Sequence, residues 1–396
     1  MPRSHFRRAA VFRTYAGLLL LTACVYALMY GPQPMFNAIS RDFDVDGGMI
    51  GLVVGVFMLS LCVSPLCIGM VLGKIGIRRA VLLSSLLLGV SGMGVYLAPT
   101  YPVFLAVRTA QALLAPVLLT SVMAGIAAMF RHLDLNRALA GYVASNLVGS
   151  LFGRLAGGMC AELLGWRIAL TGICCLFFLC LPALRRMPDV GTAQARMHSP
   201  GEYREVFRQK GIPSLLFVEA CGIFVFAAIG NLIPLRMAEL GQGNSEGLIA
   251  VMYLGYSVGL AASACLRPLT RLFGTEGRLL VFGSGLFVTS MLTLAAPSLW
   301  SLFAGLWLIA LGEFIVHALC PGIINRIAVR SGRCDRSMVN GLFLSCYYFG
   351  GVLGSWVPGL CYASLDWFAC YLCMQIAQVC AFVTILRLRR DMPELE

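Results

Sequence analysis

The chain has 396 residues, of which 59% are hydrophobic and only 12% are charged. Soluble proteins have about 45–50% apolar and about 25% charged residues, so this chain cannot cover its surface with polar groups and is expected to lie in a membrane. Its net charge of +12 falls in short loops between apolar segments, which indicates membrane topology and contact with anionic lipid rather than nucleic-acid binding.

Apolar segments long enough to cross a bilayer follow one another through the whole sequence, since a spanning helix needs about 20 such residues. The segments are continuous and show no period-two alternation, which argues against a transmembrane β-barrel. We therefore predict an all-α membrane protein with twelve transmembrane helices. Their expected ranges are 15–37, 48–72, 79–98, 101–129, 138–162, 167–184, 213–237, 246–267, 279–296, 299–325, 337–362 and 367–387.

The basic residues are concentrated in alternate loops, a pattern that marks the cytoplasmic side of membrane proteins. The opposite loops hold mainly Arg41, Arg167 and Arg236. Both termini are therefore expected in the cytoplasm, and the first apolar segment is read as a retained helix because no small-residue cleavage site follows it. The basic residues of the expected cytoplasmic side are Arg3, Arg7, Arg8, Arg13, Lys74, Arg78, Arg79, Arg131, Arg137, a cluster from Arg185 to Lys210, Arg267, Arg271, Arg278, Arg326, Arg330, Arg333, Arg336, Arg387, Arg389 and Arg390.

The longest connection, residues 188–211, is polar, charged and rich in proline, and it separates six apolar segments from six. It predicts an N-terminal six-helix bundle over 1–187, a cytoplasmic linker, and a C-terminal six-helix bundle over 212–396. Within the linker, residues 202–210 have the composition of a short interfacial helix.

Residues 141–167 and 341–367 repeat one glycine-rich pattern at a spacing of 201 residues. Gly149 corresponds to Gly350, Gly153 to Gly354, Gly158 to Gly359 and Trp166 to Trp367. A membrane helix repeated at half the length of the chain indicates two parallel, pseudo-symmetric halves, an architecture typical of secondary transporters.

Three motifs carry a family resemblance. Residues 69–79, GMVLGKIGIRR, resemble the loop signature of the major facilitator superfamily, and Arg108-x-x-Gln111 resembles its second motif. Residues 149–158, GSLFGRLAGG, resemble its antiporter motif. The end of the first helix, Tyr30-Gly-Pro-Gln-Pro, and Tyr347-Tyr348-x-Gly350 are more narrowly similar to the bacterial inner-membrane arabinose-efflux and multidrug-efflux permeases.

The resemblance implies the major facilitator fold and a gating role for the motif residues. Two departures weaken what it implies, because Gly73 replaces the acid of the loop signature and Arg154 replaces a proline of the antiporter motif. The resemblance implies that this acid latches the outward-facing gate in the family. Without it, the latch is expected to be weak or to be formed differently, for example by Arg78 and Arg79 against helix ends. The residues assigned to gating are Gly69, Gly73, Gly76, Arg78, Arg79, Gly153, Gly157 and Gly158.

Ionisable side chains deep inside the expected spans are costly in lipid and are functional candidates by default. They are Arg108, Arg154, Glu219, Glu313 and His317. The third, sixth, ninth and twelfth spans hold no charge away from their ends, and in the family fold these helices stand outermost. The distribution of charge therefore agrees with the fold that the motifs imply.

Glu313 and His317 are four residues apart, so they share one helix face and can form a hydrogen bond. Both groups are candidates to exchange protons near neutral pH, which a proton-coupled carrier requires. The alternative is a neutral pair that packs its helix against a neighbour, and the functional reading is preferred. Glu219 is expected either to carry protons as well or to pair with an arginine.

The candidate substrate-binding residues include two arginines whose roles stay open. Arg108 is expected to receive an anionic substrate or to balance a buried acid, and Arg154 to bind substrate or to hold its helix to backbone carbonyls. The polar residues expected to line the path with them are Tyr26, Tyr30, Gln33, Gln111, Asn231 and Tyr347.

No catalytic, metal-binding or cofactor-binding pattern is apparent. The 16 cysteines, except Cys334, lie inside expected spans, where cysteine behaves as a small hydrophobic residue. A phosphate-binding glycine loop with its lysine is absent, so ATP is not expected to drive this protein.

Together these features predict a non-enzymatic secondary transporter of the bacterial inner membrane. It is expected to work as a monomer, in contact with lipid, and to move a small organic solute outward by alternating access in exchange for protons. Proton-coupled or facilitated uptake of a small solute, an anionic one included, is the alternative within the class. A non-transporting membrane sensor or scaffold is the distant alternative from another class.

Overall fold

The computed structural model describes residues 2–130, 135–184, 187, 199–332 and 334–392. Every regular element in these ranges is a helix, which confirms the predicted all-α class. Ten of the described helices are long and apolar enough to cross a membrane. Outside the described residues lie linker residues 188–198 and the arginines Arg131, Arg185, Arg186, Arg196 and Arg333.

The other two expected spans are helical too, although the count of twelve stays a prediction. Residues 337–362 lie within α15 (Arg336–Ser364). The span expected over 246–267 is broken into α10 (Glu246–Met252), the 3-10 turn η2 (Tyr253–Tyr256) and α11 (Ser257–Ala264). Gly255 in this turn packs against Leu306 and Trp307.

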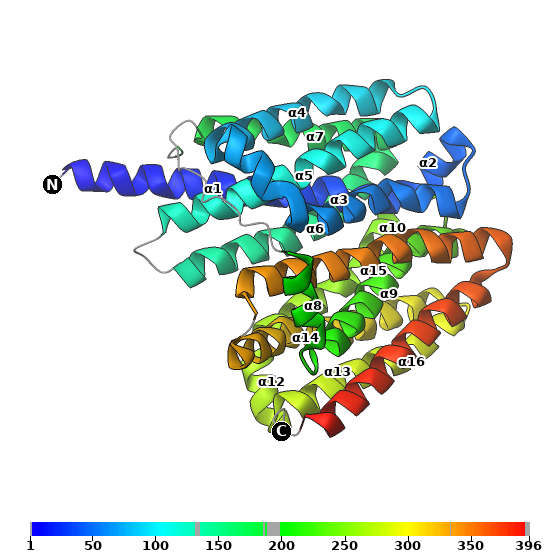
Figure 1. The fold of residues 1–396 in the computed structure, drawn as a ribbon. Coiled ribbons are helices and arrows are strands. Elements are labelled where there is room, and N and C mark those ends of the chain that lie inside the picture. The colour runs from blue at the N-terminus through cyan, green and yellow to red at the C-terminus, as the bar shows by residue number, and fades with distance from the viewer. Residues whose placement is uncertain (1, 131–134, 185–186, 188–198, 333, 393–396) are drawn as a thin grey trace. The chain divides into compact units, whose positions relative to one another are not determined.

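The chain divides into two compact units, and residues 1–43, 66–196 and 245–250 form unit 1. In this unit α4 packs against both α5 and α7, and α1 packs against α6 and α7, an arrangement that Figure 1 shows in blue, cyan and green. The helices of unit 1 are α1 (Pro2–Tyr30), the 3-10 turn η1 (Gln33–Met35), α2 (Phe36–Phe43), α4 (Ile77–Leu97), α5 (Tyr101–Met129), α6 (Leu135–Leu164) and α7 (Trp166–Leu184), with the end of α3 and the start of α10.

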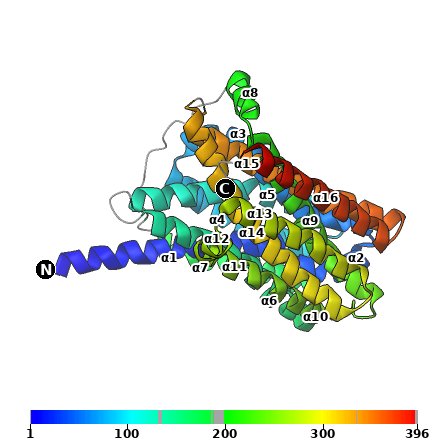
Figure 2. The same ribbon diagram turned by 90° about the horizontal axis from the view of Figure 1, so that it is seen from below.

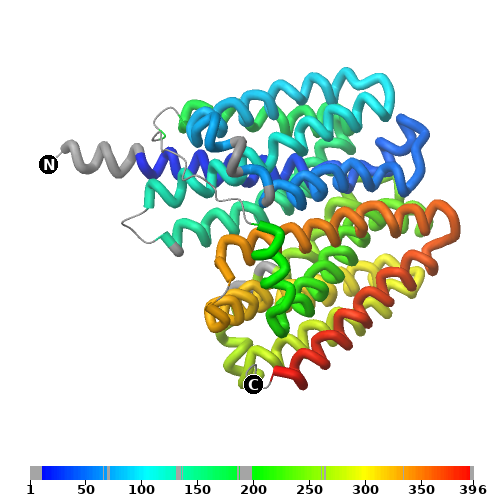
Figure 3. Tube along the Cα trace, viewed as in Figure 1, coloured from blue at the N-terminus to red at the C-terminus, as the bar shows by residue number. Residues whose placement is uncertain are grey.

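Residues 44–65, 197–244 and 251–396 form unit 2. In this unit α13 packs between α14 and α16 (Figure 2), and α15 and α16 run in opposite directions from the turn at 365–366 (Figure 3). The helices of unit 2 are α15, α11, η2 and the end of α10, given above, with most of α3 (Gly47–Ile75), α8 (Pro200–Arg208), α9 (Ile212–Glu239), α12 (Leu266–Phe273), α13 (Glu276–Ser290), the 3-10 turn η3 (Met291–Ala295), α14 (Leu299–Ser331) and α16 (Trp367–Asp391). The predicted domain boundaries, 1–187 and 212–396, stay a prediction.

The repeated glycines perform the same structural task in each unit. In unit 1, a Cβ on Gly149 or Gly153 would overlap the α1 backbone at Ala23 and Ala27. In unit 2, a Cβ on Gly350 or Gly354 would overlap the backbone of α9. Small residues let membrane helices approach to backbone contact, so the sequence repeat corresponds to two equivalent helix crossings, α1 with α6 and α9 with α15.

A glycine with a positive φ recurs at two short turns. Gly76, between α3 and α4, has a φ of 83°, and Gly274, between α12 and α13, also has a φ of 83°. L-residues rarely adopt this region, so glycine is the residue that makes such a sharp connection between consecutive helices. The two turns are not identical, because ψ is 147° at Gly76 and −37° at Gly274, and α12 and α13 are separated by one residue more than α3 and α4.

Helix ends differ from the sequence prediction at several places, and two of the differences have a clear local cause. The first span was expected to continue to residue 37, but α1 ends at Tyr30 and the chain turns at Pro32 and Pro34 before α2 begins. Proline lacks the N–H that a continuing helix needs, which accounts for the break. In the linker, the short helix expected over 202–210 is α8, which starts earlier because Ser199 and Glu202 form a capping box.

Candidate functional site

Helices α9 and α14 of unit 2 bring Glu219, Glu313 and His317 into one cluster. His317 Nδ1 lies 2.8 Å from Glu219 Oε2, and ligand atoms of the three side chains all lie within 4.8 Å of one another. Glu219 is 1% exposed and Glu313 is 5% exposed. We call these three residues the acid–imidazole cluster.

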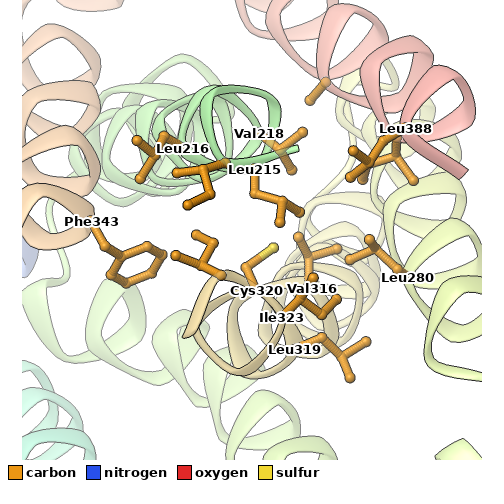
Figure 4. Packing of buried hydrophobic residues seen from close by; sticks show 14 of the residues in the cluster. Leu215, Leu216, Val218, Leu280, Val316, Leu319, Cys320, Ile323, Phe343 and Leu388 are labelled. Atoms are coloured by element: carbon orange, nitrogen blue, oxygen red, sulfur yellow. The ribbon is translucent and has the colours of Figure 1, made fainter. Parts of the chain in front are cut away.

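The cluster lies on two helices whose neighbouring residues belong to the apolar core of unit 2. Figure 4 shows the buried core of unit 2, in which Leu215, Leu216 and Val218 of α9 face Val316 and Cys320 of α14. Such surroundings have a low dielectric constant, so an ionised carboxylate here needs a proton, a counter-charge or hydrogen bonds. The protonation of the two glutamates and the imidazole is therefore interdependent.

His317 is the accessible member of the cluster. Its side chain is 36% exposed, and its ring lies 4.8 Å from the ring of Tyr347 on α15. Tyr347 also stacks on Phe343. An imidazole with one partly exposed side and one side bonded to a buried carboxylate is suited to pass a proton between the surroundings and the buried acids.

The structure changes one pairing expected from sequence. Glu313 and His317 share a face of α14, but the hydrogen bond of His317 goes across to Glu219 on α9. Glu219 was expected to carry protons or to pair with an arginine, and its described partner is the imidazole. The Cys320 thiol also interacts with Glu219, while Glu219 Oε1 is buried and accepts no hydrogen bond from the described residues.

Two carboxylates and an imidazole are also groups that hold divalent metal ions. In this cluster His317 Nδ1 and Glu219 Oε2 are engaged with each other, an arrangement that favours proton exchange over coordination. We assign no metal to it, and the predicted absence of a metal site stays a prediction.

A second polar cluster lies in unit 1 around Arg154, which is 2% exposed. Its Nε donates to Gln33 Oε1 at 2.7 Å, its Nη1 donates to the backbone carbonyl and hydroxyl of Ser150, and its guanidinium lies 4.3 Å from the centre of the Tyr30 ring. Tyr30 stacks on Tyr26. Four residues singled out in the sequence, Arg154, Gln33, Tyr30 and Tyr26, therefore meet at one place, and we call them the Arg154 cluster.

Arg108 belongs to a different environment in unit 1. It is fully buried, and it donates to Gln111 Oε1 at 2.8 Å and to the carbonyl of Met29 at 3.4 Å. Gln111 in turn donates to Ser91 Oγ on α4 and to Cys174 Sγ on α7. This network joins α1, α4, α5 and α7, an arrangement that fits a structural role for Arg108 and Gln111 better than substrate contact.

The remaining candidates are placed as follows. Asn231 is buried in α9, and its amide lies near Gly51 of α3. Ser150 and Cys320, which contact Arg154 and Glu219, were not singled out from the sequence. Each lies one helical turn from a candidate, Ser150 from Arg154 and Cys320 from His317, so helix periodicity was the signal that pointed to them.

The residues assigned to gating fall into two groups. Gly153, Gly157 and Gly158 lie on α6, where a Cβ on Gly158 would lie 2.6 Å from the Cβ of Ala250 and 2.8 Å from the carbonyl of Glu246. Gly69 and Gly73 lie on α3, and Gly73 is exposed with nothing within 4 Å of an added Cβ. Gly76 makes the turn, and Arg78 and Arg79 follow it in the first turn of α4.

Comparison with known proteins places this geometry in a family context. Residues 18–332 match the profile of the Major Facilitator Superfamily. The chain is 23% identical over 353 residues to the MFS-type transporter YybF of Bacillus subtilis, covering 86% of this chain and 85% of that protein. It is 24% identical over 375 residues to the inner membrane transport protein YnfM of Escherichia coli, covering 91% and 86%.

The fold is also similar to a solved transporter structure. The crystal structure of the nucleoside transporter NupG superposes with a TM-score of 0.76 at 11% sequence identity, covering 95% of this chain and 99% of that one. At this identity the likeness concerns the fold alone. It confirms the predicted fold class, whereas the narrower arabinose-efflux subgroup stays a prediction.

Proposed function

The chain belongs to the Major Facilitator Superfamily and is a multi-pass membrane transporter rather than an enzyme. We propose that it exports a small organic solute in exchange for protons. The observation that carries the proposal is the acid–imidazole cluster, in which Glu219 and His317 are hydrogen-bonded and the buried Glu313 lies beside them.

The charge of this cluster depends on how many protons it holds. With His317 protonated and both glutamates ionised, the cluster carries one net negative charge, and one further proton makes it neutral. A buried charge is costly in a membrane protein, so the two protonation states favour different exposures of the cluster to water. Coupling needs this difference, because a proton can shift a conformational equilibrium only through its differential affinity for the two states.

Substrate contact is proposed for the Arg154 cluster of unit 1 and, independently, for Asn231 and Tyr347 of unit 2. The buried guanidinium over Tyr30, with the Gln33 amide beside it, supports a solute that has a hydrogen-bonding group and an unsaturated or anionic part. Arg108 and Gln111 were also predicted to bind substrate, and their contacts support a structural role instead.

The proposal extends to topology and environment. We propose that the chain lies in the bacterial inner membrane and works as a monomer. Both termini are proposed to lie in the cytoplasm, because the basic residues gather on one set of loops. The proposed partners are the solute, protons and membrane lipid, without nucleic acid and without a cofactor. The glycines of the α6 crossing and of the α3–α4 turn are proposed to serve the gating motion.

The test is a transport screen on purified, reconstituted protein. Liposomes containing the chain are loaded with radiolabelled organic anions, sugars, nucleosides and amphipathic drugs, and each is assayed for counterflow and for movement driven by a pH gradient. The proposal expects at least one solute to move against its gradient towards the acidic side. Movement together with protons would favour uptake by symport, and counterflow without any effect of pH would favour facilitated diffusion. A protein that binds ligands but moves none of them would support the sensor alternative.

A further inference from the structure

Gly222 lies three residues after Glu219 on α9, on the same face of the helix. If this residue had a Cβ, the three nearest atoms would all belong to the Glu313 carboxylate, with Oε1 at 2.6 Å, Cδ at 2.8 Å and Oε2 closer still. The carboxylate of Glu313 therefore occupies the space that any other residue at position 222 would fill.

The contact differs in kind from those of the crossing glycines. A Cβ on Gly350 or Gly354 would meet the backbone of α9, which cannot move independently of its helix. A Cβ on Gly222 would meet the far end of a flexible side chain that belongs to the acid–imidazole cluster. The absence of a side chain at Gly222 thus leaves room for a carboxylate, whereas at Gly350 and Gly354 it lets two helices approach each other.

The two helices that make this contact, α9 and α14, also pack against other helices, α16 and α13. On α14, Gly312 precedes Glu313 and packs on α13, where an added Cβ would lie 2.7 Å from the carbonyl of Gly283. On α9, the carbonyl of Cys221 accepts a hydrogen bond from the buried Gln378 of α16 at 3.3 Å. A methyl group at position 222 is therefore relieved by displacement of the carboxylate rather than by separation of the helices.

We infer that Gly222 is a positioning residue of the coupling site, which keeps the Glu313 carboxylate against α9 and within reach of Glu219 and His317. The inference rests on the proposed coupling role of Glu313. The titratable groups that face Glu313 among the described residues are Glu219 and Cys221 of α9 and His317 and Cys320 of α14, and Tyr347 of α15 lies behind His317.

The test follows the Glu313 carboxyl group itself and needs no known solute. Infrared difference spectra of the full-length protein in lipid are recorded across a pH titration, and the carboxyl band that disappears in Glu313→Gln is assigned to Glu313. Gly222→Ala is expected to move the titration midpoint of this band by about one pH unit or more, because the carboxylate changes its distance to charged neighbours. The matched control Gly285→Ala adds the same methyl group to unit 2 in ordinary contact with Phe382 and is expected to leave the midpoint in place.

An unchanged midpoint in Gly222→Ala would overturn the inference and leave proton coupling untouched. Conversely, the midpoint could shift in Gly222→Ala while Glu313→Gln still transports along the pH gradient. This result would contradict the coupling role of Glu313 and support the positioning role of Gly222. If Gly222→Ala folds poorly, the double variant Gly222→Ala/Glu313→Asp shortens the acid by one methylene. The inference expects it to fold as well as Glu313→Asp alone, and failure to do so would place the clash in the backbone and overturn the inference.

Discussion

His317 Nδ1 and Glu219 Oε2 lie 2.8 Å apart and join α14 to α9 across 98 residues of sequence. The carboxylate is buried and the imidazole is partly exposed. The pair is thus the link between the buried acids and the more accessible side of the cluster, and it couples the position of two helices to the protonation of two side chains.

Removing the imidazole is expected to destabilise the fold, because Glu219 would keep a buried oxygen without its partner. Leaving a buried acceptor unsatisfied costs about 1–3 kcal/mol, so His317→Ala is expected to lower the thermal unfolding temperature in detergent. Glu219→Gln/His317→Ala should be less destabilised than the sum of its two single variants, as expected for residues in contact. Strictly additive effects would mean that the hydrogen bond contributes nothing to stability.

The sequence predicted much of this cluster but not its central bond. The spacing of Glu313 and His317 placed both on one helix face, because the period of the helix alone decides that relation. The bond between His317 and Glu219 depends on how α9 packs on α14, which no local pattern encodes. The same holds for Arg154 and Gln33, both singled out in the sequence but 121 residues apart, and for Gly222, whose role appears only once the Glu313 carboxylate is placed.

The crossing glycines are expected to be intolerant of even a methyl group. Overpacking costs about 1–3 kcal/mol, so Gly153→Ala in unit 1 and Gly354→Ala in unit 2 should each lower the unfolding temperature. Gly172→Ala on α7 is the matched control, because nothing lies within 4 Å of its added Cβ and alanine favours the helix by about 1 kcal/mol. Equal stability of all three variants would contradict the close crossings.

Restoring the missing acid of the loop signature is expected to strengthen the closed cytoplasmic state. Gly73 is exposed and has room for a side chain, and an aspartate there lies one turn before the N-terminus of α4 and its two arginines. Position 73 lies in the last turn of α3, whose dipole disfavours an acid, so the expected gain comes from the N-terminus of α4 and its arginines and is about 0.3–1 kcal/mol, up to about a fivefold shift between near-equal conformers. Thiol labelling of cysteines introduced on the cytoplasmic side should slow in Gly73→Asp, whereas Gly73→Asn is the uncharged control. The same labelling rate in both variants and the parent would exclude a latch at this loop.

The topology is tested by single cysteines in a background without the native thiols. Cysteines in the segments 131–137, 186–211 and 326–336 should resist membrane-impermeant reagents in intact cells, because these basic segments are predicted to be cytoplasmic. Cysteines at 40–46 and 239–245 should react. Labelling of the 186–211 segment from outside would contradict its predicted cytoplasmic position and, with it, the twelve-helix topology.

Proton coupling is tested most directly at Glu313, with Glu219 as the comparison. Glu313→Gln is nearly isosteric and removes only the titratable charge, so substrate exchange at equal pH should continue while transport driven by a pH gradient is lost. His317→Ala should displace the pH optimum without abolishing transport, because the imidazole acts through the two acids. Both rates are measured in proteoliposomes with the solute identified in the counterflow screen. If Glu313→Gln keeps the parental rate along the proton gradient, the proton site shifts to Glu219, and Glu219→Gln should then show the loss. If both variants keep that rate, the acid–imidazole cluster is a structural device and the carrier is driven by something other than protons.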